Sequence, residues 1–129
     1  MAHRSRLAGF IIDCQTDDLD AAADFWAQAL GCTVADRAAG DAAGRYQRLG
    51  DTPHGLHIEV QQVAHPSRVH LDIEADDVHA EAARLEALGA RKLAFVRERW
   101  WVMEAPTGQR FCVVPMADPE RGLTPRTWD

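Results

Sequence analysis

The sequence has little that would bind a nucleic acid or a membrane. It has 14 Lys and Arg residues against 20 Asp and Glu, a net charge of −6, which disfavours duplex nucleic acid and anionic membrane surfaces as partners. No apolar run approaches the roughly 20 residues of a membrane helix. The N-terminal stretch also lacks the apolar core of a secretory signal. The three cysteines are odd in number and have no paired spacing, which favours reduced thiols and a cytoplasmic protein.

The motifs of several enzyme classes are also missing. The chain has no Gly-rich phosphate loop, no G-x-S-x-G, no paired C-x-x-C and no HExxH. Hydrolase, nucleotide-binding and zinc-finger functions therefore find no support. The hydrophobic content of 47% and the charged content of 26% are instead ordinary for a globular protein. A length of 129 residues predicts a single domain over residues 1–129.

What the sequence does contain is an internal repeat. Residues 13–32 read DCQTDDLDAAADFWAQALGC and residues 71–90 read LDIEADDVHAEAARLEALGA. Each copy has an apolar strand, an Asp-Asp pair, an Ala-rich amphipathic helix and Leu-Gly. The offset is 59 between Asp17 and Asp76. Two copies are too few for a solenoid, so the repeat predicts a pseudo-two-fold fold with a shared site where equivalent positions meet.

Hydrophobic periodicity predicts the same order of elements in both copies. Helices are expected over residues 18–30 and 77–88, each starting after an Asp that can cap it. A loop is expected at 38–44, and the tail 115–129 is expected to be irregular. The expected strands are 6–15, 33–37, 45–49 and 56–63, then 68–74, 92–97, 99–104 and 110–114. The order βαβββ, twice, predicts an α+β fold with module one over about 6–63 and module two over about 68–114.

Three stretches resemble the vicinal oxygen chelate superfamily of glyoxalases, bleomycin-resistance proteins and extradiol dioxygenases. They are DLDAAADFWAQALG at 18–31, SRVHLDI at 67–73 and WVMEAPTGQRFCVV at 101–114. The resemblance implies two βαβββ modules that form a curved mixed sheet, with a small-molecule ligand in a sheet-lined cup. It also implies a homodimer, which would cover sheet edges and surplus apolar surface. The activities of the superfamily range from lyase, isomerase and dioxygenase to non-catalytic drug binding.

Metal-dependent members of that superfamily carry four ligands on strands related by the pseudo-two-fold. In this chain these positions fall at Ile11, Glu59, His70 and Cys112. Ile11 cannot bind a metal, so the resemblance implies a reduced site. Glu59, His70 and Cys112, with water, could hold a divalent cation such as Zn, Fe, Mn or Ni. The alternative is that Cys112 is a small buried hydrophobe and that no metal binds.

Period-two spacing places further polar side chains on the same strand faces. One set is His57, Glu59 and Gln61, and the other is His70, Asp72 and Glu74. Carboxylates close to imidazoles suit general acid–base chemistry. We therefore assign catalysis to His70 and Glu59, and substrate binding to His57, Gln61 and Asp72. The alternatives are a buried His70–Asp72 hydrogen bond without chemistry, and solvated strand ends at His57 and Glu74.

Arg110 and the adjacent tryptophans complete the predicted site. Arg110 shares a strand face with Cys112 and could stabilise a carboxylate or enolate, or could instead pair with a neighbouring carboxylate. Trp100 and Trp101 point to opposite sides of their strand; we assign Trp101 to substrate binding, although parity does not identify which one packs under a helix.

Three functions remain open at this point, of which the weakest is a dimeric module with no ligand of its own. The first is a small-molecule enzyme that acts on a compact oxygenated or anionic substrate, with His70, Glu59 and Arg110 in the chemistry. The second is a non-catalytic protein that sequesters an aromatic or cationic drug. The apolar residue at Ile11 favours the second, because drug binders of this superfamily lack the ligand quartet.

Overall fold

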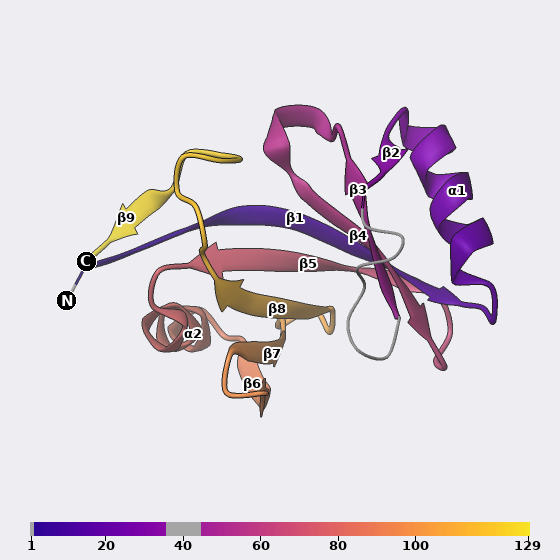
Figure 1. Cartoon of the computed structure of the whole chain (residues 1–129). Helices are drawn as coiled ribbons and strands as arrows, with labels where there is room; N and C mark the ends of the chain where they lie inside the picture. The colour runs from indigo at the N-terminus through magenta and orange to yellow at the C-terminus, as the bar shows by residue number, and fades with distance from the viewer. Residues whose placement is uncertain (1, 36–44) are drawn as a thin grey trace. The chain divides into compact units, whose positions relative to one another are not determined.

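The computed structural model describes residues 2–35 and 45–129, so the loop expected at 38–44 lies outside the described residues. The described chain has helices α1 (Leu19–Leu30) and α2 (Val78–Ala87) and a 3-10 turn at Pro53–Gly55. Among these residues no helix has the length and apolar character needed to cross a membrane. The strands in Figure 1 are β1 (His3–Gln15), β2 (Thr33–Val34), β3 (Tyr46–Gly50), β4 (His57–Val63), β5 (Arg68–Ala75), β6 (Arg91–Val96), β7 (Trp100–Glu104), β8 (Arg110–Pro115) and β9 (Arg126–Trp128).

The chain divides into two compact units, and the element order confirms the α+β prediction of two βαβββ modules. One unit is Phe10–Val69, and the other combines residues 2–9 with His70–Asp129. Strand β1 contributes its two halves to different units. The hydrogen-bonded order is β2-β3-β4-β1 in the first unit and β1-β5-β8-β7-β6 in the second, with β9 paired to β1. The sheet is mixed, because β5 and β8 are parallel while β8, β7 and β6 are antiparallel.

Helix α1 in the unit Phe10–Val69 begins and ends as its sequence predicts. The Asp18 carboxylate accepts the first-turn amide of Ala21 at 3.1 Å, which satisfies one of the amides left without a helical partner. Gly31 ends the helix with a φ of 71°, a left-handed conformation that glycine adopts without a steric penalty. The buried face of α1 packs against β3 and β4, in a core of Ile12, Leu19, Ala23, Ala27, Leu49, Ile58 and Val60.

Helix α2 in the other unit lies against β6, β7 and β8 (Figure 1). It begins after Asp77, whose carboxylate accepts the amides of His79 and Ala80 at 3.1 and 3.0 Å. Its core cluster is Ala75, Ala82, Met103 and Val113. Leu71 differs from expectation: it points to the α2 side of β5, as the alternation predicts, yet it is 51% exposed.

The two ends of the chain are more ordered than expected. Strand β1 starts at His3 rather than near residue 6, and the tail contains β9. The two extensions pair with each other in antiparallel register, His3 opposite Trp128 and Ser5 opposite Arg126. Each therefore supplies the hydrogen-bond partners that the other lacks, a non-local pairing that periodicity within either segment does not reveal.

Candidate functional site

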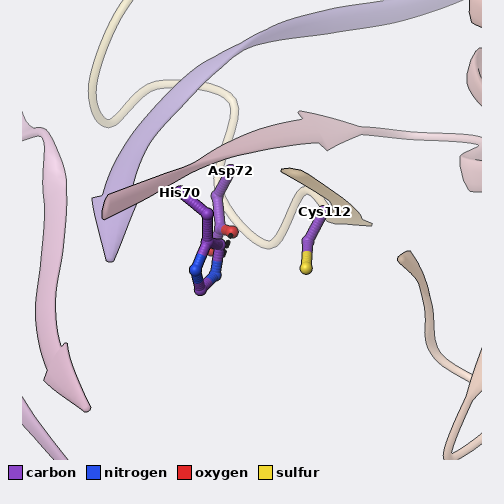
Figure 2. A group of neighbouring side chains, drawn as sticks. All are labelled: His70, Asp72 and Cys112. Carbon is purple, nitrogen blue, oxygen red and sulfur yellow. Dashed lines mark ion pairs between the residues drawn. The ribbon is translucent and has the colours of Figure 1, made fainter. Parts of the chain in front are cut away.

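Three side chains converge on one side of strands β5 and β8. His70 and Asp72 come from β5 and Cys112 comes from β8. Figure 2 shows the imidazole, the carboxylate and the thiol pointing to the same side of their strands. Their potential ligand atoms all lie within 4.8 Å of one another. This cluster belongs entirely to the unit that contains α2.

Strand alternation and register explain the convergence. Phe111 and Val113 pack in the α2 cluster, so Cys112 between them points to the opposite face. Asp72 lies directly opposite Cys112 in the parallel pairing of β5 and β8. His70 precedes Asp72 by two residues and therefore shares its face. The register of two strands, rather than a sequence motif, brings the three groups together.

The cluster is shielded from solvent without being sealed. The side chains of His70 and Asp72 are 14% and 11% exposed, and His70 Nε2 lies 3.7 Å from Asp72 Oδ1. An imidazole nitrogen, a carboxylate oxygen and a thiolate sulfur are a donor set that suits a divalent transition metal such as zinc. The residues present therefore fit a metal, with Asp72 as a ligand that the sequence analysis had assigned to substrate binding.

Glu59 lies on β4 in the unit Phe10–Val69, where its carboxylate pairs with His57. Gln61 on the same strand donates from Nε2 to the Tyr46 hydroxyl at 3.1 Å. All three polar residues of β4 alternate with the buried Ile58 and Val60. The period-two pattern thus correctly predicts that His57, Glu59 and Gln61 share one strand face.

Trp101 lies on the α2 side of its strand. Its indole N–H donates to His79 Nδ1 at 3.2 Å, and its ring contacts Phe95 at 4.8 Å between centroids. Trp100 therefore points to the other side of β7. The choice between the two tryptophans that parity left open is thereby resolved, while the substrate contact assigned to Trp101 stays a prediction.

Arg110 is exposed at the start of β8 and lies opposite Glu104 on β7. Its Nε is 3.9 Å from Glu104 Oε2. A hydrogen bond from Arg91 lowers the pKa of Glu104, and the charge of Arg110 adds to this effect. The structure thus has the carboxylate pairing that the sequence analysis considered as the alternative to an anion clamp.

The sequence analysis missed Asp13. This residue is only 2% exposed, and its Oδ2 lies 3.9 Å from Arg68 Nε. The repeat contained the signal: 72 minus the offset of 59 is 13, so Asp13 is the counterpart of Asp72. Both copies thus bury an acidic residue at the same place, where a charge is costly unless it is paired.

Comparison with known proteins identifies a family and a set of structural neighbours. The sequence profile of a family described as a glyoxalase-like domain matches residues 9–114. No curated protein matches the chain. Among solved structures, a methylmalonyl-CoA epimerase in complex with methylmalonyl-CoA and NH4+ is 21% identical, with a TM-score of 0.63 over 88% of this chain and 96% of that one.

Two further epimerase structures show the same likeness. Methylmalonyl-CoA epimerase from Mycobacterium tuberculosis is 17% identical, with a TM-score of 0.65, over 88% of this chain and 89% of that one. A point variant of the Streptomyces coelicolor enzyme, in complex with 2-nitronate-propionyl-CoA, is 22% identical, with a TM-score of 0.60, over 87% and 94%. At these identities the likeness establishes the fold.

Proposed function

The chain belongs to the glyoxalase-like domain family, and we propose that it is a small-molecule enzyme with its reaction centre at His70, Asp72 and Cys112. The substrate is a compact oxygenated or anionic organic molecule, and the reaction is of the lyase, isomerase or dioxygenase type. Among these we place isomerase first, because epimerases recur among the neighbours of the same fold. The observation that carries the proposal is the convergence of three ligating groups within 4.8 Å.

A divalent metal bound by these three side chains would supply a Lewis acid able to polarise an oxygen of the substrate. The Cys112 thiol would bind as a thiolate, and the imidazole of His70 would bind in its neutral form. Asp72 would bind through a carboxylate oxygen, and its negative charge would offset part of the charge of the metal. Three protein ligands leave a position open for water or substrate, as catalytic sites require.

Other polar groups have supporting roles in this proposal. Glu59 stays a predicted base, and within the unit Phe10–Val69 its partner is the imidazole of His57. Arg110 can exchange its long contact with Glu104 for an anionic group of the substrate. A homodimer also remains part of the proposal.

The test is a metal titration of protein prepared free of metal. Zinc and cobalt binding is measured by calorimetry for the wild type and for His70→Ala, Asp72→Asn and Cys112→Ser. Loss of a ligand or of its support lowers metal affinity by about tenfold or more, so we expect each variant to bind at least that much more weakly. His54→Ala and His65→Ala are matched controls, because His54 is exposed, His65 is half-buried, and both lie outside the cluster.

Two outcomes would contradict the proposal. If no metal co-purifies and none can be titrated into the wild type, the metal centre is wrong. If His70→Ala also leaves the affinity of every organic ligand unchanged, His70 is structural and the reaction centre is wrong as well. Tight binding of a cationic drug without turnover would instead favour the sequestration protein.

A further inference from the structure

The residues that lie outside the family match form a structure of their own. The profile covers residues 9–114, whereas residues 3–5 pair with Arg126–Trp128 as β1 and β9. Between β8 and β9, residues 116–125 form a connection that we call the tail segment. It leaves β8 beside the end of β5, where the amide of Met116 donates to the Ala75 carbonyl at 2.9 Å.

Arg6 anchors the middle of the tail segment. Its guanidinium donates to three backbone carbonyls, at 2.7 Å to Asp118 and at 3.1 Å to both Pro119 and Leu123. It also pairs with Glu74 through Nη2, at 2.7 Å from Oε2. The Arg6 side chain is only 5% exposed. Because these bonds satisfy a buried charge, the tail segment is held in one conformation at this point.

A second anchor holds the end of the chain. The Trp128 indole N–H donates to Ser5 Oγ at 2.8 Å, and its ring lies 3.9 Å from the Arg84 guanidinium carbon. Arg84 in turn donates two hydrogen bonds of 2.8 Å to the buried carboxylate of Glu81, to which His3 also bonds at 2.7 Å. The tail segment is therefore fixed at both of its ends as well as at Arg6.

The anchor at Arg6 places the tail segment next to the reaction centre. Glu74 follows Asp72 by two residues on β5, so both side chains point to the same face and lie about 6.6 Å apart along the strand. The Arg6 guanidinium that binds Glu74 also binds the carbonyls of residues 118, 119 and 123. A ligand at His70, Asp72 and Cys112 that extended along β5 towards Glu74 would therefore meet the tail segment.

We propose that the tail segment is a wall of the ligand site and limits its ligands to compact molecules that end before Glu74. This role rests on the proposed function, because it assumes that ligands bind at His70, Asp72 and Cys112. Arg6 is then a positioning residue: it determines ligand size through the tail segment and takes no part in the reaction.

The Cys112 thiol provides a probe that requires neither a metal nor a substrate. Iodoacetamide and iodoacetamidofluorescein have the same reacting group but differ in bulk, and mass spectrometry reports their rates at each cysteine. A wall should slow the bulky reagent at Cys112 more than the small one. Arg6→Met should raise the bulky-to-small rate ratio at Cys112 by about tenfold, the change produced by a barrier lowered by about 1.4 kcal/mol.

The controls distinguish a specific effect of the tail segment on access to Cys112 from a general loss of structure. Arg4→Met removes an arginine from the same strand whose side chain pairs with Asp76, so the ratio at Cys112 should stay at its wild-type value. The ratio at Cys32, in the unit Phe10–Val69, should not change in any variant. If Arg6→Met does not fold, Glu74→Gln keeps an acceptor for Arg6 but removes its charge partner, and the same ratio should rise by a smaller factor.

An unchanged ratio at Cys112 in a folded Arg6 or Glu74 variant would contradict the proposal that the tail segment is a wall of the ligand site. So would a Cys112 that reacts with neither reagent in the wild type, since the site must admit small molecules. Failure of zinc and cobalt to bind the wild type would instead contradict the proposed function. The two failures are therefore distinguishable, because the alkylation ratio is measured without metal.

Discussion

The two modules build their helices in the same way but carry different chemistry on the strand before each helix. Asp18 and Asp77 cap α1 and α2 at equivalent places. At the ligand position, however, the second module has His70 in a cluster of ligating groups, whereas the first has Ile11, which is buried at 4% exposure. The two modules therefore share a scaffold, while the side chains at this position of the two strands differ in their ability to bind a metal.

A second difference lies inside the helices. Glu81 of α2 is fully buried, and its repeat counterpart, 59 residues earlier, is Ala22, which packs against an apolar core. The second unit thus replaces apolar packing with a charged network of Glu81, Arg84, His3 and Ser5. This network connects α2 to residues near both ends of the chain. The unit Phe10–Val69 contains neither end.

Removing the buried carboxylate should have the largest effect on stability. Breaking a buried ion pair by deleting one partner typically costs about 3 kcal/mol or more, because the remaining polar groups lose their partner. We expect Glu81→Ala to lower the free energy of unfolding by about that amount in urea titrations. Glu86→Gln is the control on the same helix, since Glu86 is 44% exposed and pairs with the surface residue Lys92. Equal small losses for both variants would show that the network contributes little.

The same network should make the second unit sensitive to acid. Burial acts to raise the pKa of Glu81, but hydrogen bonds from Arg84, His3 and Ser5 hold that pKa below its usual value of 4.5. A carboxyl with a lowered folded pKa contributes stability that is present above its unfolded pKa and is lost as the pH falls through its folded pKa.

We therefore expect the unfolding free energy of the wild type to fall below about pH 4.5, more steeply than that of Glu81→Gln. Urea titrations at a series of pH values measure both slopes. Parallel slopes would mean that Glu81 does not take up a proton on unfolding in this range.

The exposed apolar residues of the central strands offer a test of the predicted homodimer. Leu7 and Leu71 are 41% and 51% exposed and lie on the neighbouring strands β1 and β5. Full burial of a leucine side chain contributes about 1.5–3 kcal/mol. Leu71→Glu should therefore weaken a dimer by about tenfold or more in analytical ultracentrifugation. Leu88→Glu, at the end of α2 and 67% exposed, is the control. A wild type that sediments as a 14.3 kDa monomer at all concentrations would refute the dimer.

The smallest expected effects come from the two helix caps. An Asp that caps a helix contributes about 1 kcal/mol relative to Ala. Asp18→Ala and Asp77→Ala should each lower the unfolding free energy by about that amount, as measured by urea denaturation. Similar losses would support the view that the modules share one scaffold. A loss at only one site would show that the two helix starts are unequal in energy.

Local patterns predicted much of the fold. The caps Asp18 and Asp77, the helix end at Gly31 and the alternation along β4 follow from interactions within a few residues of the chain. The sequence also predicted His70 as the first-choice candidate ligand, through its repeat position and the family resemblance, and its role stays a prediction. Asp13 could have been found in the same way, because the repeat offset points directly to it.

The set of side chains around His70 was decided by the tertiary structure. Asp72 joins Cys112 because parallel strands β5 and β8 pair residues 40 positions apart, and Trp101 lies under α2 because of the orientation of β7. The order in the tail depends on pairing between residues near the two ends of the chain. The amino-acid sequence by itself determined the helices, the strand faces and the repeat, since near neighbours control these. Strand register and burial depend on contacts between distant segments, so only the folded chain determined which groups meet.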